Sequence, residues 1–301
     1  MAANTVRVVP AKAPMGRNAI LRMIGLILLQ LFMTALVITF LVPTLWMISS
    51  SLKASTEVFK QPIVWIPAEP QWSNYPMVFE KLPLFGRFAL NTILITALAV
   101  IGTIISSLMV GYSFSRLRWP GRNVFFALMI ATMMLPDVVT LIPRFILFKN
   151  LGLLRPDMGG GMVPLILPYW FAASGLYVFF ANQYFRGLPV ELEEAALIDG
   201  ADRIQILTQI LIPLAKPLIA TIGIFALLQH YNEFMTPLIY LSRMENWVLA
   251  LGVRAINDAQ AARWELVFAA ATMMFAPVLI LFVFAQRYFV QGIAMTGFGG
   301  R

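Results

Sequence analysis

The stretch Leu188-Pro-Val-Glu-Leu-Glu-Glu-Ala-Ala-Leu-Ile-Asp-Gly-Ala-Asp202 is the longest polar interruption in the second half of a very apolar chain. It holds five carboxylates among helix-forming residues, with leucine, alanine and isoleucine at short spacing. This pattern predicts a helix that is polar outside and apolar on one side. Because long apolar runs flank the stretch, we expect a helical loop between two membrane spans that docks onto a soluble partner.

Composition places the chain among polytopic membrane proteins. Apolar residues make up 60% of the 301 positions and charged residues only 12%, whereas a soluble domain has about 25% charged residues. The net charge of +8 reflects basic residues at the ends of apolar runs, where they anchor spans, so no nucleic acid partner is expected. The absence of cysteine and the single histidine exclude disulfides and cysteine or histidine metal clusters.

The apolar runs predict six transmembrane helices and an all-α fold. A helix needs about 20 apolar residues to cross the hydrocarbon core. Two runs are interrupted: 123–143 contains Asp137 beside Pro136, and 217–232 reaches full length only if its helix begins near Ile210. The first run is too long for a signal peptide and is expected to remain as a span. The four uninterrupted runs are 23–52, 88–115, 158–185 and 266–286.

Basic residues near the span ends predict the orientation. Residues 1–22 and the loop 116–122 carry arginine and lysine without any acid, which is typical of cytoplasmic segments. Six spans then place both termini and the loop 189–211 in the cytoplasm, although three basic residues between 144 and 155 weaken the charge bias. The predicted parts are a tail over 1–18, a six-helix domain over 19–293 with the cytoplasmic loop at 189–213, a tail over 294–301, and external loops at 53–87, 144–157 and 233–265.

The order of residues within the loop predicts its local structure. Pro189 suits the start of a helix, where its missing N–H costs little, and the following glutamates favour the positive end of the helix dipole. Gly200 permits a sharp turn with positive φ, and a second helical piece is expected over 202–211. An ordinary interfacial helix is the alternative, but membrane-lying helices carry Lys and Arg on their polar face, whereas this one is acidic.

The pattern Glu194-Ala195-Ala196, Asp199-Gly200-Ala201, Ile210, Pro213 and Pro217 resembles the EAA loop of ABC importer permeases. In that family the short helix of this loop is the coupling helix, which sits in a groove of the cytoplasmic ATPase. Leu207 departs from the family pattern, where an aromatic residue is expected, and a leucine can still fill an apolar socket. The resemblance implies ATPase-coupling roles for Glu191, Glu194, Ala195, Ala196, Asp199, Gly200 and Ala201.

The resemblance extends over roughly 20–293. The segments 45–53, 232–239 and 286–292 are similar to sugar-importer permeases of the maltose-like group, with departures at Tyr231 and Thr236. It implies the type I ABC importer permease fold, a second permease of similar fold, two ATP-binding cassette ATPases and an extracytoplasmic solute-binding protein. It also implies a bacterial or archaeal inner-membrane location and alternating access driven by ATP.

The chain is not expected to be an enzyme or to bind a cofactor itself. Its glycine run, Gly159-Gly160-Gly161, lacks the following Lys and Ser or Thr of a P-loop. ATP and Mg²⁺ are therefore expected on the partner ATPases. Glycerol phosphates or other polyols remain alternative solutes. An ion-coupled secondary transporter is a further alternative, but such proteins usually show internal repeats and several buried ionisable groups.

Polar residues within or beside the spans are candidates for the translocation path. Asp137 is costly in a membrane run, and such residues usually face a cavity or a partner; the alternative is a carboxylate satisfied by Arg144 or water. The cluster around Gln229 could line an external gate, contact a binding protein or lie solvated at the interface. The candidate path residues are Asp137, Tyr177, Gln229, Asn232 and Glu233.

Small residues recur four apart in the second span. Gly102, Ser106, Gly111 and Ser115, with Ser107 beside them, form this stripe. Spacing of this kind lets two helices pack closely in a membrane. We therefore expect the stripe to be a helix-packing surface.

Overall fold

The structure is a computed structural model that describes residues 17–259 and 263–297, and the predicted tails at 1–18 and 294–301 fall partly outside these ranges. The described residues are helical and contain no strand. The elements are α1 (Arg17–Ser51), η1 (Ser55–Glu57), α2 (Asn74–Lys81), α3 (Phe85–Arg116), α4 (Arg122–Met133), α5 (Asp137–Asn150), η2 (Pro156–Met158), η3 (Val163–Leu165), η4 (Leu167–Phe171), α6 (Gly175–Gly187), α7 (Glu191–Ile198), α8 (Arg203–Gln205), η5 (Ile206–Leu211), α9 (Ile212–Leu214), α10 (Lys216–Tyr231), α11 (Met235–Tyr240), η6 (Met244–Asn246), α12 (Leu249–Ala259) and α13 (Trp264–Gly297).

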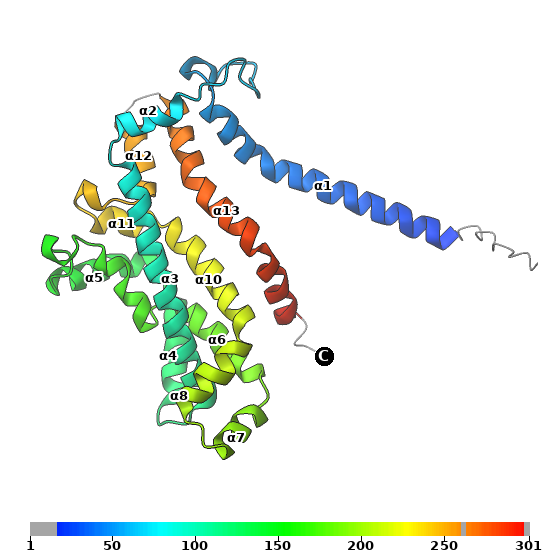
Figure 1. The fold of residues 1–301 in the computed structure, drawn as a ribbon, viewed down its shortest axis with the longest axis vertical. Helices are drawn as coiled ribbons and strands as arrows, with labels where there is room; N and C mark the ends of the chain where they lie inside the picture. Colours follow the sequence, from blue (N-terminus) through cyan, green and yellow to red (C-terminus); the bar gives the residue numbers. More distant parts are fainter. Residues whose placement is uncertain (1–16, 260–262, 298–301) are drawn as a thin grey trace, which may run out of the picture.

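Helix α3 runs through the middle of the bundle, from the end that carries α2 to the end that carries α7 (Figure 1). It packs along α6 and α10. A Cβ at Gly111 would lie 2.4 Å from the Cβ of Ala181, and one at Gly102 would lie 2.5 Å from the Trp170 ring. Side chains do not approach this closely, so a larger residue at either position would have to displace its neighbour. The predicted packing role of the small-residue stripe is confirmed.

The candidate membrane spans are three long continuous helices and three bent helix pairs. Within the described residues, three helices are long and apolar enough to cross a membrane, and the total reaches six if each bent pair is one span. The pairs bend by 107° between α4 and α5, by 53° between η3 and η4, and by 79° between α9 and α10. The predicted all-α fold is confirmed. The two interrupted runs are bent, and the run 158–185, predicted to be uninterrupted, is bent as well.

Prolines explain where the first two pairs bend. Pro136 adopts an extended backbone just before α5, and a proline also disfavours helical geometry in the residue before it. The fourth predicted span, 158–185, is not one helix: short 3₁₀ turns containing Pro164 and Pro168 precede α6. The predicted external loop at 144–157 is helical as far as Asn150.

Helix α1 projects away from the bundle and diverges from α13 along its length (Figure 1). Its large apolar side chains from Leu21 to Leu41 are mostly exposed within this single chain. An apolar helix of this kind is stable only in contact with lipid or another membrane-embedded surface. The chain therefore behaves as one component of a larger membrane assembly or as a lipid-embedded protein.

Separate buried clusters hold the two ends of the bundle together. At the α7 end, side chains of α3, α6, α7, η5 and α10 pack together, including Phe185 of α6 and Ile206 and Leu211 of η5. At the α2 end, α2, α3, α12 and α13 meet around Phe88 and Leu266. These clusters hold the helices that position the loop around α7 and the polar side chains between the spans.

Candidate functional site

The loop after α6 folds as the sequence predicts. Helix α7 begins at Glu191 with three glutamates in its first turn. Gly200 adopts φ +85°, a conformation that side chains other than glycine adopt at a cost. Asp202 then caps α8: its Oδ1 accepts from the backbone N–H groups of Ile204 and Gln205, each at 2.8 Å.

Helix α7 buries one narrow face and exposes the rest. Glu193 and Ala196, three residues apart, are buried, and Ala201 packs beside them. The other predicted coupling residues, Glu191, Glu194, Ala195, Asp199 and Gly200, are exposed. Large apolar side chains are exposed beside them: Val190, Leu192, Leu197, Ile198 (86% exposed) and Ile204.

Buried Glu193 faces Arg116, the last residue of α3. Arg116 Nε and Glu193 Oε1 are 3.0 Å apart, with side chains 8% and 6% exposed, although the N–H is not aligned as a hydrogen bond. Burial raises the pKa of Glu193, while the positive charges of Arg116 and Arg203 lower it in part. Sequence reasoning did not single out Glu193 or Arg116, because the pattern of one chain does not show which glutamate turns inward.

The connection from the loop to α10 is irregular. Residues Ile206–Leu211 form η5, a π-helix, and the chain bends by 79° at Ala215 before α10 begins. The predicted second helical piece is present in this form. Leu207 is buried in the cluster at the α7 end, so its side chain fills this chain's own core rather than an external socket.

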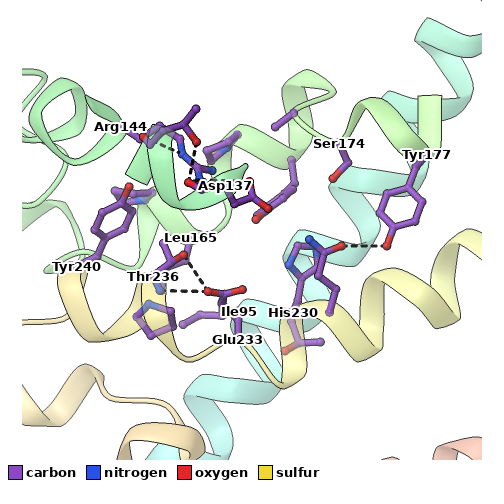
Figure 2. Close-up of a pocket in the computed structure, with 18 of the residues that line it drawn as sticks. Ile95, Asp137, Arg144, Leu165, Ser174, Tyr177, His230, Glu233, Thr236 and Tyr240 are labelled. Carbon is purple, nitrogen blue, oxygen red and sulfur yellow. Dashed lines mark hydrogen bonds and ion pairs between the residues drawn. The ribbon is translucent and has the colours of Figure 1, made fainter. Parts of the chain in front are cut away.

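A second candidate site is a cavity of about 600 Å³ between α3, α5, α6, α10 and α11 (Figure 2). Its size lies within the range of about 300–1,000 Å³ that is typical of small-molecule sites. Four of the five predicted path residues line it: Asp137, Tyr177, Gln229 and Glu233. Asn232 does not; its side chain is exposed and donates to the carbonyl of Leu228 at 2.9 Å.

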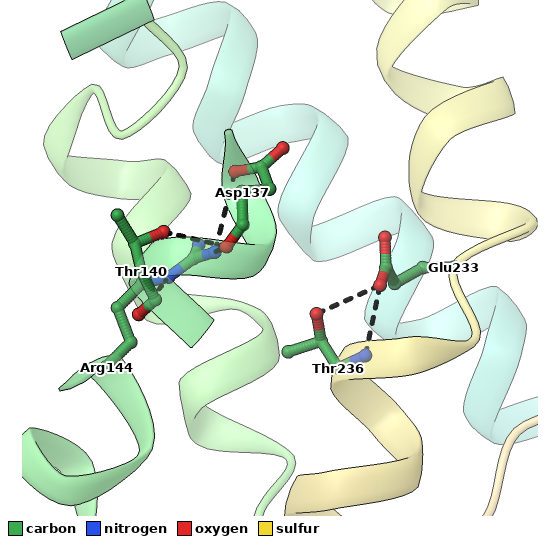
Figure 3. Close-up of polar contacts among 5 residues, drawn as sticks. All are labelled: Asp137, Thr140, Arg144, Glu233 and Thr236. Carbon is green, nitrogen blue, oxygen red and sulfur yellow. Dashed lines mark hydrogen bonds and ion pairs between the residues drawn. The ribbon is translucent and has the colours of Figure 1, made fainter. Parts of the chain in front are cut away.

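Charged side chains meet at the cavity wall (Figure 3). Arg144 Nη2 lies 3.5 Å from Asp137 Oδ1, with side chains 41% and 92% exposed, and it also donates to the Asp137 carbonyl at 3.3 Å. Asp137 is therefore both paired with Arg144 and open to the cavity. On the facing side, Glu233 Oε1 accepts from the Thr236 hydroxyl at 2.9 Å and from its backbone N–H at 3.1 Å.

Neutral polar and aromatic groups complete the lining. The Tyr177 hydroxyl donates to Gln229 Oε1 at 3.0 Å (Figure 2), which joins two predicted residues from α6 and α10. The rings of Tyr169 and His230 meet edge to face, with centroids 4.2 Å apart, and both residues line the cavity. Aromatic faces and hydrogen-bonding groups together can hold a polar solute with apolar ring faces.

Comparison with known proteins identifies the family. The family described as the binding-protein-dependent transport system inner membrane component matches residues 102–295, more than half of the chain. The chain belongs to this family. It is a permease subunit of an ABC importer, as the resemblance of its EAA loop implied, and it is an inner-membrane component that works with other subunits.

Individual relatives cover most of the permease. It is 31% identical to the sulfoquinovosyl glycerol transport system permease protein of Agrobacterium fabrum, over 88% of this chain and 91% of that one. It is 30% identical to an arabinooligosaccharides transport system permease protein of Halalkalibacterium halodurans (86% and 91%). It is also 30% identical to the sn-glycerol-3-phosphate transport system permease protein of Yersinia pestis (82% and 87%).

A solved structure shares the fold. A chain of a bacterial ABC transporter involved in the import of the acidic polysaccharide alginate superposes with a TM-score of 0.75 at 26% identity. The match covers 92% of this permease and 100% of that chain. The type I importer permease fold implied by the sequence is thereby confirmed.

Proposed function

We propose that this permease imports a sugar or oligosaccharide by alternating access, driven by ATP hydrolysis on partner subunits. The relatives that transport arabinooligosaccharides and sulfoquinovosyl glycerol support a glycan-like solute. The observation that carries the proposal is the cavity, which joins aromatic rings to hydrogen-bonding groups at a volume suited to a small molecule. The permease catalyses no reaction itself and binds no cofactor.

The partners follow from the exposed surface of the loop. The exposed acids and apolar side chains of α7, together with Gly200, form a contact surface for an ATPase that binds ATP and Mg²⁺. We propose a complex of this permease, a second permease, two ATPases and an extracytoplasmic binding protein. Both termini and α7 then lie in the cytoplasm, and the α2 end faces the binding protein.

The charges of the cavity favour an uncharged solute over glycerol phosphate. Its ionisable lining includes the carboxylates of Asp137 and Glu233 and one guanidinium, that of Arg144. Arg144 is already paired with Asp137, so a phosphate would have to break that pair while facing Glu233. The relative that carries sn-glycerol 3-phosphate keeps this solute as the second candidate.

The solute is tested by uptake into proteoliposomes that contain the full complex. The panel holds labelled arabinotriose, diacetylchitobiose, maltotriose and sn-glycerol 3-phosphate, each with and without ATP inside. We expect ATP-dependent uptake of a neutral oligosaccharide. Uptake of glycerol phosphate alone would support the second candidate, and uptake that persists without ATP but needs an ion gradient would refute the ABC mechanism.

The proposed contact between α7 and the ATPase is tested with Gly200 in the loop and Gly187 at the end of α6. An added Cβ meets nothing within 4 Å at either Gly187 or Gly200, but only Gly200 has positive φ. The ring of a proline fixes φ at about −65°, which is incompatible with the positive φ of Gly200. Gly200→Pro is therefore expected to abolish uptake while ATP hydrolysis and membrane insertion continue. Gly187→Ala is the matched control and is expected to transport normally. Normal uptake by Gly200→Pro would contradict the docking role.

A further inference from the structure

Arg116 makes contacts with two separate elements at the α7 end. Besides the ion pair with Glu193, its Nη2 donates to the carbonyls of Phe185 and Leu188. Phe185 lies in the last turn of α6, and Leu188 follows the end of that helix. One guanidinium therefore joins α3, the end of α6 and α7.

The geometry suits arginine in particular. A guanidinium presents five N–H donors in a fixed planar fork, whereas a lysine ammonium is a compact point charge. Arg116 uses Nε toward the carboxylate and Nη2 toward the two carbonyls. The Phe185 carbonyl also accepts from the backbone N–H of Leu188 at 3.2 Å, so Arg116 adds a second donor there and supplies a donor to the Leu188 carbonyl beyond the helix end.

The C-terminal side of the loop packs into the same buried cluster through η5, but it reaches α10 through an irregular backbone. From Gly200 the chain passes through α8 and the π-helix η5 and then bends by 79° before α10. Mid-helix π-turns are rare and often mark functional positions. Helix α7 is thus tied by side chains to α3 and α6, and is joined to α10 through an irregular segment.

We propose that Arg116 is a positioning residue that locks α7 to the ends of α3 and α6, so that these three elements move as one body during transport. This inference rests on the proposed function of α7 as the ATPase-docking helix. When an ATPase displaces α7, the displacement passes directly to α3, whose residues Thr92 and Thr96 line the cavity. The position of the loop relative to α10 then changes by bending of the backbone at η5 and Ala215.

The lock can be measured by distance without any partner subunit. Because the chain lacks cysteine, spin labels attach only at introduced positions such as exposed Met109→Cys on α3 and Ile198→Cys on α7. We expect double electron–electron resonance in nanodiscs to give one narrow distance distribution. Glu193→Gln and Arg116→Gln should broaden it, Arg116→Lys should give an intermediate width, and the exposed neighbour variant Arg118→Gln should leave it unchanged.

The functional consequence is measured as solute imported per ATP hydrolysed. The full complex in proteoliposomes is used, with the labelled oligosaccharide that the wild type imports fastest. We expect Glu193→Gln to lower this ratio by at least about fivefold, the lower end of typical coupling between sites, while ATP hydrolysis continues and Arg118→Gln behaves as wild type. Glu193→Asp should restore part of the ratio.

Two results would overturn the lock. Distributions of Glu193→Gln and Arg116→Gln that superimpose on the wild type would show that the contacts do not hold α7. Broadened distributions with an unchanged import ratio would show that holding α7 does not serve coupling. A wild-type complex that fails to import with ATP would refute the proposed function instead, and the distance measurement would still decide the lock. If Arg116→Gln does not fold, Glu193→Gln and Arg116→Lys carry the test.

Discussion

The Arg116–Glu193 pair and the Arg144–Asp137 pair place the same kinds of charge in opposite surroundings. The first is sealed at the α7 end, with side chains 8% and 6% exposed, and the second lies on an open cavity wall, with side chains 41% and 92% exposed. Arg116 reaches elements far apart in the sequence, whereas Arg144 and Asp137 both belong to α5. The buried pair therefore fixes relative positions of helices, and the open pair can rearrange locally around a solute.

The two ion pairs also differ in how much their removal changes the stability of the protein. A buried ion pair loses much of its attraction to desolvation, yet removing one partner costs about 3–5 kcal/mol because it leaves a buried charge. An exposed pair contributes only about 0–1 kcal/mol. The two arginines are thus expected to respond very differently to the same substitution.

The largest effect is expected for Arg116→Ala. It leaves Glu193 buried without its ion-pair partner and removes the guanidinium donor from the Phe185 and Leu188 carbonyls. We expect a loss of about 3–5 kcal/mol in the free energy of unfolding, measured by denaturation of the purified permease in detergent. Arg118→Ala, two residues away and exposed, is the control. Equal stabilities of the two variants would contradict the importance of the buried pair.

The next effect concerns the close approach of α3 and α6 beside that pair. Gly111→Val forces its side chain into Ala181 and the backbone of Asn182, and overpacking of this kind costs about 1–3 kcal/mol or more. The thermal unfolding midpoint should fall accordingly. Gly223→Ala, whose Cβ would meet Ile104 at an ordinary 3.5 Å, should keep the wild-type midpoint. A tolerated valine at 111 would show that α6 can move away from α3.

Arg144→Ala should change transport more than stability. Because the pair is exposed, its removal should lower the free energy of unfolding by no more than about 1 kcal/mol. The substitution also removes the positive charge and the hydrogen bonds at the cavity wall. We expect normal unfolding and reduced uptake, with Asp137→Asn showing the same pattern. If both variants import as fast as wild type, the pair is only a local contact within α5.

The smallest effect is a pH dependence from Glu193, which faces Arg116 and Tyr112 of α3 and Arg203 of α8. Burial raises its pKa beyond what the two arginines offset. When folding raises the pKa of a carboxyl group, the protonated group contributes its full stability to the folded state below the pKa that it has in the unfolded chain. This contribution is lost as the pH rises through the pKa of the folded state.

The unfolding free energy of wild type minus that of Glu193→Gln should therefore fall as the pH rises from the ordinary carboxyl pKa through the raised pKa of folded Glu193. The glutamine variant cannot ionise and supplies the baseline. A difference that increases with pH would instead mean that the arginines outweigh burial.

The sequence predicted features that depend on neighbours along the chain. The acidic first turn of α7, the positive φ of Gly200 and the close packing at Gly111 each follow from local chemistry. The sequence did not predict features that depend on contacts within the folded chain. The interruption at Pro136 and Asp137 does not reveal that α4 and α5 meet at 107°. A basic residue at a span end resembles a membrane anchor in the sequence even when its side chain is buried, as that of Arg116 is.

The cavity was predicted in part for the same reason. Asp137, Gln229 and Glu233 stand out as polar groups within or beside apolar runs, and all three line the cavity. The structure also brings Gln229 into contact with Tyr177. Asn232 follows Gln229 closely in sequence, but three residues in a helix turn through about 300°, and α10 ends at Tyr231. Its side chain therefore points away from the group that the sequence placed it with.

The π-helix η5 makes this stretch unusually tolerant of a change in length. A wide turn holds one residue more than an α-helix needs, so deleting exposed Thr208 could be absorbed by tightening Ile206–Leu211 into an ordinary turn. The same deletion in α3 would rotate every later side chain by about 100° and carry Gly111 away from Ala181. Length variation among homologous chains should therefore be accommodated at η5 and forbidden in α3.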